Sequence, residues 1–223
     1  MKICLITYDR PHLKTAQVFW GLWFRREFEI SFLIVPFKDR KQRTPSISHR
    51  PPQFIGVSGQ TIAETYNLTI YNYEERRLAL RNDAVLVCGA NILEDEFVKA
   101  GKVINCHPGL IPKTRGLDSF KWAIHDGQQV GNSLHWIDSE PDAGEVIHEL
   151  PTPVFRDDTL TSFAMRHYEN EIFLLQHFDN FLNGKGNAFP LEKGELHKRM
   201  PPEKEEMLLH DFDAYKERWC SEV

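Results

Sequence analysis

Short apolar runs alternate along the chain with longer segments whose apolar residues recur at helical spacing. The apolar runs predict strands at residues 3–7, 30–35, 67–72, 84–88, 103–106, 132–138 and 145–150. The helical spacing predicts helices at residues 15–26, 60–66, 94–100, 118–126, 159–182 and 211–219, with Asp118 as an acidic cap of the fourth. Strands that alternate with helices in this way predict an α/β fold, with a mostly parallel twisted sheet and helices on both faces.

Two segments depart from this alternation. Residues 37–52 predict a long loop, which is rich in basic residues: Lys38, Arg40, Lys41, Arg43, His49 and Arg50. This loop is either a solvated connection or an anion-binding flap, since long structured loops in compact domains tend to be functional. The residues after the long helix are polar and irregular. We therefore expect one main domain over residues 1–185 and a short C-terminal extension over residues 186–223.

Composition narrows the class of protein. A chain of 223 residues with 41% hydrophobic and 26% charged residues is typical of a globular protein. The net charge of −5 argues against a nucleic-acid partner. Neither a signal peptide nor a membrane-spanning run is evident, so we expect a cytoplasmic protein without a membrane partner. The scattered cysteines predict buried thiols at Cys4, Cys88 and Cys106 rather than disulfides or a metal site. The oligomeric state stays open, with a homodimer among the options.

Candidate chemistry lies in three polar residues. Asn105 and His107 stand two positions apart at the end of a predicted strand, so their side chains share a face, and ligands of open α/β sheets bind beyond such strand ends. Asp142 precedes Gly144 in a turn that could return it over the same crevice. An amide that stabilises an oxyanion, an imidazole that passes protons and a carboxylate that supports the imidazole together suit acyl transfer to an attacking amine. From the spacing alone, a satisfied network of core side chains explains the same residues.

Several motifs follow one another in order between residues 84 and 155. They comprise Asn105–Pro112 (NCHPGLIP), Arg115-Gly116, Trp122–Ile124, Gly127, Gly131, His135, Ile137-Asp138 and Asp142–Gly144. Together they resemble the folate-dependent formyltransferase family, which includes glycinamide ribonucleotide formyltransferase, methionyl-tRNA formyltransferase and the sugar N-formyltransferases. One departure from the family is Asn-Ser-Leu before His135, where Gly131 is usually followed by Val-Thr. We expect this change to affect strand packing more than catalysis.

The resemblance implies a Rossmann-like formyltransferase fold and 10-formyltetrahydrofolate as the donor. It matches Asn105, His107 and Asp142 to the catalytic residues: an amine attacks the formyl carbon, His107 handles the proton, and Asn105 and His107 stabilise the oxyanion. The residues that it implies for binding the folate pterin are Cys88, Gly89, Ala90, Asn91, Ile92, Leu93, Ile137, Asp138 and Gly144. The first strand-to-helix loop contains no glycine, so the dinucleotide-binding fingerprint is absent.

Two further comparisons within the family narrow the choice of acceptor substrate. The polar stretch after the long helix is too short for the RNA-binding domain of the methionyl-tRNA enzymes, and Tyr8–His12 lacks the glycine- and serine-bearing phosphate loop of the ribonucleotide enzymes. The remaining class is the sugar N-formyltransferases of surface-glycan biosynthesis, of the pseudaminic acid or perosamine type, which act on nucleotide-linked amino-dideoxy sugars. The predicted substrate-binding residues are Tyr8, Arg10, His49, Arg50, Lys113, Arg115, Gly116 and Asp118.

Two other functions stay open. One is a formyltransferase that acts on another amine, such as a ribonucleotide or a carrier-bound aminoacyl group. The other is a non-catalytic module that binds folate or a sugar. Four aromatic residues either stack on a ligand or pack in the core: Tyr8, Trp20, Trp122 and Trp136.

Overall fold

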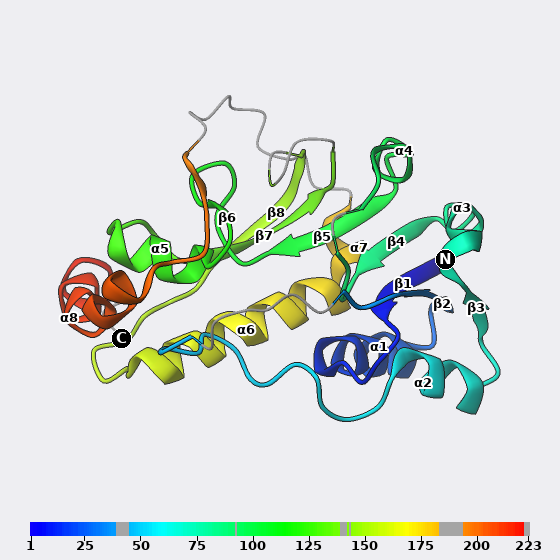
Figure 1. The fold of residues 1–223 in the computed structure, drawn as a ribbon, viewed down its shortest axis with the longest axis horizontal. Helices are drawn as coiled ribbons and strands as arrows, with labels where there is room; N and C mark the ends of the chain where they lie inside the picture. The colour runs from blue at the N-terminus through cyan, green and yellow to red at the C-terminus, as the bar shows by residue number, and fades with distance from the viewer. Residues whose placement is uncertain (39–44, 92, 139–141, 143, 183–193, 221–223) are drawn as a thin grey trace.

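Seven strands form one sheet in the order β3-β2-β1-β4-β5-β7-β8 (Figure 1). This computed structural model describes all residues except 39–44, 92, 139–141, 143, 183–193 and 221–223. The strands are β1 (Lys2–Tyr8), β2 (Glu29–Val35), β3 (Thr69–Tyr71), β4 (Ala84–Val87), β5 (Val103–His107), β7 (Gly131–Trp136) and β8 (Val146–Pro151). The first five strands run parallel to one another, β7 pairs antiparallel with β5, and β8 pairs antiparallel with β7 and so runs in the direction of the first five. This confirms the predicted α/β fold with a mostly parallel sheet.

Helices cover both faces of this sheet, as predicted (Figure 1). Helices α1 (Leu13–Arg25), α2 (Gly59–Thr65) and α6 (Leu160–Gln176) lie on one face, and the 3₁₀ turn η1 (Tyr73–Glu75) with α3 (Arg76–Ala79) and α4 (Asp95–Val98) lies on the other. Side chains of β1 alternate between two apolar clusters, with Ile3 and Leu5 toward α1 and α6, and Cys4 and Ile6 toward α3 and α4. Both sides of the parallel strands are therefore buried.

The long predicted helix is present but ends earlier than its pattern indicated. Its predicted inner face is buried throughout, at Leu160, Phe163, Ala164, Tyr168, Ile172, Leu175 and Phe178. Thr159 caps the first turn by accepting a hydrogen bond from the Ser162 backbone N–H. The helix stops at Gln176, and a separate short helix, α7 (Phe178–Phe181), follows. No glycine or proline marks this break in the sequence, so the prediction of one helix to residue 182 was wrong at its end.

The C-terminal helix α8 (Pro202–Trp219) is twice as long as the prediction of residues 211–219. Pro202 at its first position and acidic residues in its first turn favour this start. The apolar pattern missed it because a charged residue, Glu205, occupies a buried position there and pairs with Lys121 of α5 (Ser119–His125). Helices α5 and α8 and the first half of α6 share a third apolar cluster.

The segment before α8 holds the second, smaller sheet. Two-residue strands β6 (Arg115–Gly116) and β9 (Leu196–His197) pair in parallel there. Strands of this length leave no periodic signal, and the prediction did not include them. Asp118 occupies the capping position of α5, but its backbone is left-handed (φ 56°) and its side chain makes no capping hydrogen bond. The carboxylate accepts from the Met200 backbone N–H instead, so the predicted acidic cap was wrong.

The predicted basic loop has no regular structure over its described residues, 37–38 and 45–52, whereas Arg40, Lys41 and Arg43 lie outside the described residues. Cys4, Cys88 and Cys106 are buried, and Cys88 lies directly after β4 rather than within it. Burial raises the pKa of the Cys4 and Cys88 thiols to about 12, which keeps both protonated. Within the described parts of the chain, no helix combines the length and the apolar character needed to cross a membrane.

Candidate active site

Asn105 and His107 lie toward the C-terminal end of strand β5, and His107 is its last residue. Cys106 between them belongs to the cluster beneath α1 and α6, so Asn105 and His107 face the opposite side of the sheet. His107 is buried and Asn105 is half-buried. The sequence pattern had predicted a shared face for these two side chains, and the strand geometry agrees.

Asp142 lies against His107, although the two are far apart in the sequence. Its Oδ1 is 3.3 Å from His107 Nδ1, and its Oδ2 accepts a hydrogen bond of 2.9 Å from the Gly116 backbone N–H. Arg115 Nε donates to the Asp142 backbone carbonyl at 3.2 Å. Burial by itself would raise the pKa of Asp142, but the hydrogen bonds from His107 and Gly116 and the charge of His107 hold it below its ordinary value. Asp142 is thus a carboxylate aimed at the imidazole.

The other ring nitrogen of His107 is also held. Its Nε2 is 2.9 Å from the Thr114 carbonyl oxygen and 3.1 Å from Ser119 Oγ. The Ser119 hydroxyl donates to the Gly116 carbonyl, so toward His107 it acts as an acceptor. A carbonyl can only accept, which places a proton on Nε2 in this arrangement. Both ring nitrogens therefore face oxygen atoms that orient the ring.

Asn105 has a histidine partner of its own. It lies opposite His135 in the pairing of β5 with β7, and Asn105 Nδ2 is 3.3 Å from His135 Nε2. His135 Nδ1 donates to the Trp136 carbonyl at 3.1 Å, so its Nε2 is left to accept from the Asn105 amide. Burial, with the nearby charge of His107, lowers the pKa of His135 to about 4 and keeps it neutral. Sequence reasoning gave His135 no role, because only strand register brings it to Asn105.

The predicted pterin-side loop follows strand β4. Gly89 packs so closely on Tyr8 and His12 that a Cβ there would lie 2.8 Å from the Tyr8 ring. The Tyr8 hydroxyl donates to the Ala90 carbonyl at 2.6 Å, which ties this loop to the end of β1. Cys88 is buried beneath the loop, and Ile92 lies outside the described residues.

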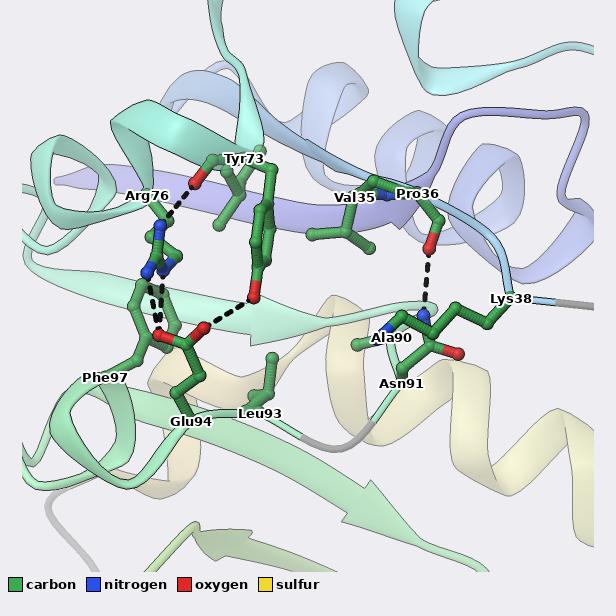
Figure 2. A pocket seen from close by; sticks show the side chains of 11 residues that line it. Val35, Pro36, Lys38, Tyr73, Arg76, Ala90, Asn91, Leu93, Glu94 and Phe97 are labelled. Atoms are coloured by element: carbon green, nitrogen blue, oxygen red, sulfur yellow. Dashed lines mark hydrogen bonds and ion pairs between the residues drawn. The ribbon is translucent and has the colours of Figure 1, made fainter.

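A pocket of about 90 Å³ opens beside this loop (Figure 2). Ala90, Asn91 and Leu93 of the predicted folate-binding set line it, together with Leu33, Val35, Pro36, Lys38, Tyr73, Arg76, Glu94 and Phe97. Glu94 accepts hydrogen bonds from Tyr73 and Arg76 at one side, and Asn91 Nδ2 donates to the Pro36 carbonyl at the other (Figure 2). The Lys38 side chain extends over Ala90 (Figure 2). The pocket thus has an apolar interior with basic groups at its edge.

The remaining predicted folate-binding residues lie beside strand β5. The Ile137 N–H donates to the Val103 carbonyl at 2.9 Å, and the Ile137 side chain packs in the cluster beneath α4. A Cβ on Gly144 would lie 1.8 Å from the Trp136 carbonyl oxygen, so only glycine fits this turn. Asp138 follows Ile137 in the chain, and Asp142, a few residues later, contacts His107.

The predicted substrate-binding residues fall into three places. Arg115 and Gly116 contact Asp142, and Lys113 and Asp118 flank them in the chain. Tyr8 and Arg10 lie at the end of β1, where the Arg10 guanidinium stacks on Phe37 at 3.7 Å from the ring centroid. His49 stacks on Phe120 of α5, with ring centroids 6.1 Å apart, and Arg50 follows it in the described end of the basic loop. The structure therefore brings two of the eight, Arg115 and Gly116, into direct contact with the predicted catalytic residues.

A buried ion pair that the sequence pattern missed lies beneath Arg50. Lys14 of α1 and Glu171 of α6 pair there, and both are almost fully buried. Burial lowers the pKa of Lys14, but the Glu171 carboxylate more than offsets this and raises it above its ordinary value. Burial raises the pKa of Glu171, and the charges of Lys14 and Arg50 hold it below its ordinary value. Periodicity could not reveal this pair, because Lys14 and Glu171 are charged residues on helix faces whose other buried positions are apolar.

Comparison with known proteins adds a second line of evidence. The sequence profile of the family described as formyl transferase matches residues 52–177. Curated relatives include phosphoribosylglycinamide formyltransferases from Haemophilus influenzae (32% identical over 97 residues, 42% of this chain and 46% of the relative) and Escherichia coli (38% over 88 residues, 38% of this chain and 42% of the relative). The matched part spans less than half the length of these curated relatives.

Solved structures share the fold over most of the chain. A sugar N-formyltransferase from a Shewanella species has a TM-score of 0.61 and 18% identity, covering 95% of this chain and 87% of that one. An N-formyltransferase from Helicobacter canadensis, in complex with folinic acid and dTDP-3-aminofucose, has a TM-score of 0.62 and 17% identity, covering 89% and 71%. At these identities the likeness concerns the fold. Together with the profile match over more than half of its length, the shared fold shows that this chain belongs to the folate-dependent formyl transferase family.

Proposed function

We propose that this chain is an N-formyltransferase that moves the formyl group of 10-formyltetrahydrofolate to the amine of a nucleotide-linked amino-dideoxy sugar. The observation that carries the proposal is the contact of His107 with Asp142 beside Asn105 at the end of β5. Family membership supports the donor, because the family is folate-dependent and a neighbour was solved with folinic acid. The proposed catalytic domain spans residues 1–185.

The described residues fit a folate beside the loop after β4. The pocket there is lined by apolar side chains and the Tyr73 ring, and Lys38 and Arg76 stand at its edge. An aromatic ring that carries carboxylates, as the benzoylglutamate part of folate does, matches this combination of surfaces. Cys88, Gly89, Ile137, Asp138 and Gly144 stay the proposed contacts of the pterin.

The three catalytic side chains have distinct proposed roles. 10-Formyltetrahydrofolate supplies the formyl group, and the substrate amine attacks its carbonyl carbon. Asn105 Nδ2 gives one N–H to His135 and has a second N–H to donate to the oxygen that becomes negatively charged. In its neutral form, with the proton on Nε2, His107 takes up on Nδ1 the proton that the amine loses, and Asp142 stabilises the imidazolium that results. The new C–N bond to the acceptor forms, the bond to folate N10 breaks, and N10 receives the proton.

The sugar acceptor has support from the basic and aromatic groups around the site. Arg10 lies just after β1, and Arg50 follows His49, whose ring stacks on Phe120 near the start of α5. These two guanidinium groups are cations of the kind that binds a diphosphate. Burial and the charge of Arg50 hold the pKa of His49 well below its ordinary value, so its neutral ring supplies a surface rather than a charge. The Helicobacter canadensis neighbour was solved with a nucleotide sugar, as was a formyltransferase from Anoxybacillus kamchatkensis, with UDP-4,6-dideoxy-4-formamido-L-AltNAc and tetrahydrofolate (TM-score 0.53, 20% identity, 89% of this chain and 86% of that one). The first loop, Tyr8–His12, also lacks the glycines of a phosphate cradle.

A second candidate acceptor is the amine of a ribonucleotide. It is favoured by the two phosphoribosylglycinamide formyltransferases that match this chain at 32% and 38% identity. These matches cover less than half of either chain, so they support the shared chemistry more than the shared acceptor.

One assay separates the two acceptors. Purified protein is mixed with 10-formyltetrahydrofolate and either a panel of nucleotide-linked 3-amino and 4-amino dideoxy sugars or glycinamide ribonucleotide, and tetrahydrofolate release is measured. We expect kcat/KM for at least one sugar to exceed that for the ribonucleotide by about a hundredfold or more, a difference that placed charges and hydrogen bonds can produce. Turnover of the ribonucleotide alone would establish the second candidate. Turnover of neither acceptor, with folate still bound, would favour a non-catalytic module.

A further inference from the structure

The segment Gly194–Met200, here called the C-terminal strap, runs beside residues 112–118. The Gly194 N–H donates to the Pro112 carbonyl at 2.8 Å, and the Leu117 N–H donates to the His197 carbonyl at 2.9 Å. The Met200 N–H donates to Asp118 Oδ2 at 3.0 Å. These bonds lie on either side of the β6–β9 pair, so the strap is bonded to this stretch along its whole length.

The same stretch of chain, extended to Ser119, holds the catalytic pair. The Thr114 carbonyl and the Ser119 hydroxyl face His107 Nε2, and the Gly116 N–H donates to Asp142 Oδ2. Arg115 Nε also donates to the Asp142 backbone carbonyl, so residues 114–119 contact both members of this pair, which in turn contact each other. Any shift of residues 114–119 moves the partners of both side chains at once.

We propose that the C-terminal strap is a positioning element for catalysis, which sets the geometry of the His107–Asp142 pair by holding residues 112–119. This inference rests on the proposed function of that pair. The C-terminal extension, whose role the sequence left open, would then take part in the chemistry. It would act indirectly, because none of its described contacts reaches His107 or Asp142.

Two glycines show how closely the strap and this stretch approach each other. Gly116 has a φ of +91°, and a Cβ there would lie 2.2 Å from the His197 carbonyl oxygen. A Cβ on Gly194 would lie 1.9 Å from the Lys113 carbonyl oxygen. Backbone meets backbone at both points, so a side chain could be admitted only if one segment moves. Gly194 is the better site for a substitution, because Gly116 itself contacts Asp142.

The strap is held from its other side by helices α5 and α8. Trp122 Nε1 donates to the Lys198 carbonyl at 2.8 Å, and the Trp122 ring stacks on His197 with centroids 4.4 Å apart. The ion pair of Lys121 with Glu205 joins α5 to α8 at a place where both side chains are fully buried. A rigid support of this kind suits a positioning role, because small displacements of a catalytic group cost much of its effect.

The decisive variant is Gly194→Ala, with Glu195→Ala as its matched control. Glu195 is the next residue in the strap and is exposed, so its truncation leaves the strap's backbone contacts in place. The first readout is the imidazole NMR signal of His107 in ligand-free protein, assigned by its loss in His107→Gln. The second is kcat and KM for 10-formyltetrahydrofolate, with whichever acceptor turns over in the assay above.

We expect Gly194→Ala to shift the His107 signal and to lower kcat by about tenfold or more, while KM for the folate changes less than about threefold. The described residues that line the proposed folate pocket belong to the loop after β4 and to neighbouring parts of β2, η1, α3 and α4 rather than to the strap or residues 112–119, which is why KM is spared. Glu195→Ala should match the wild type in both readouts. An unchanged His107 signal and unchanged kcat in a folded Gly194→Ala protein would overturn the proposal.

A milder variant decides the question if Gly194→Ala does not fold. Trp122→Phe removes the hydrogen bond to Lys198 and keeps a ring against His197. It should shift the His107 signal in the same sense and lower kcat by several-fold, and wild-type values for both would count against positioning. Absence of turnover in the wild type would defeat the proposed function, whereas the NMR signal would still report whether the strap orders His107.

Discussion

His135 sets which end of the Asn105 amide faces the candidate active site. Because its Nδ1 donates to the Trp136 carbonyl, its Nε2 accepts from Asn105 Nδ2 and fixes the amide in one of its two orientations. The amide nitrogen, which can stabilise an oxyanion, is then held by one N–H while the other stays available. A neutral imidazole is needed for this, and the low pKa of His135, about 4, provides it.

Replacing His135 should therefore impair catalysis more than folding. In His135→Leu the Asn105 amide loses its acceptor, and we expect kcat to fall by about tenfold or more with little change in KM. His135→Gln keeps an acceptor oxygen and should retain a larger part of the activity. Steady-state kinetics of the two variants, with thermal unfolding as a check, test this, and equal activity in both would refute an orienting role for His135.

The Asp142 carboxylate should matter for both activity and acid stability. Asp142→Asn removes the charge that supports the His107 imidazole, and we expect turnover at neutral pH to fall by about a hundredfold. Because the pKa of Asp142 is lowered in the folded protein, its contribution to stability is complete above the ordinary value of 3.8 and is lost as pH falls through the lower folded value. Urea unfolding of wild type and Asp142→Asn should thus differ at pH 5 and converge at the acid end; a constant difference would contradict the pairing.

Periodic patterns in the sequence predicted where most helices and strands lie, but they predicted poorly where some of them begin and end. The five parallel strands and helices α1 and α6 were predictable because their buried positions are apolar and regularly spaced. Helix α8 was predictable only in its second half, since Glu205 stands at a buried position of its first half. Strands β6 and β9 exist through contacts between distant segments, which no local pattern encodes.

The buried ion pair of Lys121 with Glu205, which hid the first half of α8 from the apolar pattern, should affect stability. Lys121→Met leaves Glu205 buried without its cation, and breaking one partner of a buried pair costs about 3–5 kcal/mol. The double variant Lys121→Met/Glu205→Leu removes both charges and should recover most of this loss, because an apolar pair avoids the desolvation cost. Urea unfolding of the two variants measures the difference. Equal losses in single and double variants would mean that the pair is not the source of the effect.

The candidate site, like the fold, was predictable where local sequence patterns position its residues and not where contacts between distant segments do. Asn105 and His107 could be placed by strand periodicity, and ordered resemblance added Asp142. The partners that orient them could not be foreseen: His135 reaches Asn105 through antiparallel register, and Thr114 and Ser119 reach His107 through a loop. Roles of all these residues stay predictions until they are tested.

Across the whole molecule, several histidines are buried in the neutral form. Burial, reinforced by neighbouring cations, lowers the pKa of His12 and of His135 to about 4, and burial does the same for His167. The unfolded chain takes up protons at a higher pH than these folded residues do, near 6.5. Their contribution to stability is therefore complete above about pH 6.5 and declines as pH falls toward 4.

This behaviour predicts acid-sensitive folding. The free energy of unfolding should fall steadily between pH 7 and pH 4.5, as measured by urea titration. His167→Gln should flatten this dependence because one buried neutral histidine is removed, whereas His210→Gln, at an exposed position of α8, should leave it unchanged. A stability that stays constant over this range would show that the histidines take up protons without unfolding.

Formyl transfer by the whole molecule can be followed on the transferred carbon itself. Wild type and His107→Asn are each mixed with 10-formyltetrahydrofolate carrying a ¹³C-labelled formyl carbon and a nucleotide-linked amino-dideoxy sugar, and ¹³C NMR follows the label. We expect the wild type to convert the label into a formamide on the sugar, and His107→Asn to do so at least about a hundredfold more slowly. A label that stayed on folate or appeared only as free formate in the wild type would rule out formyl transfer to the sugar, and a variant as fast as the wild type would rule out a catalytic role for His107.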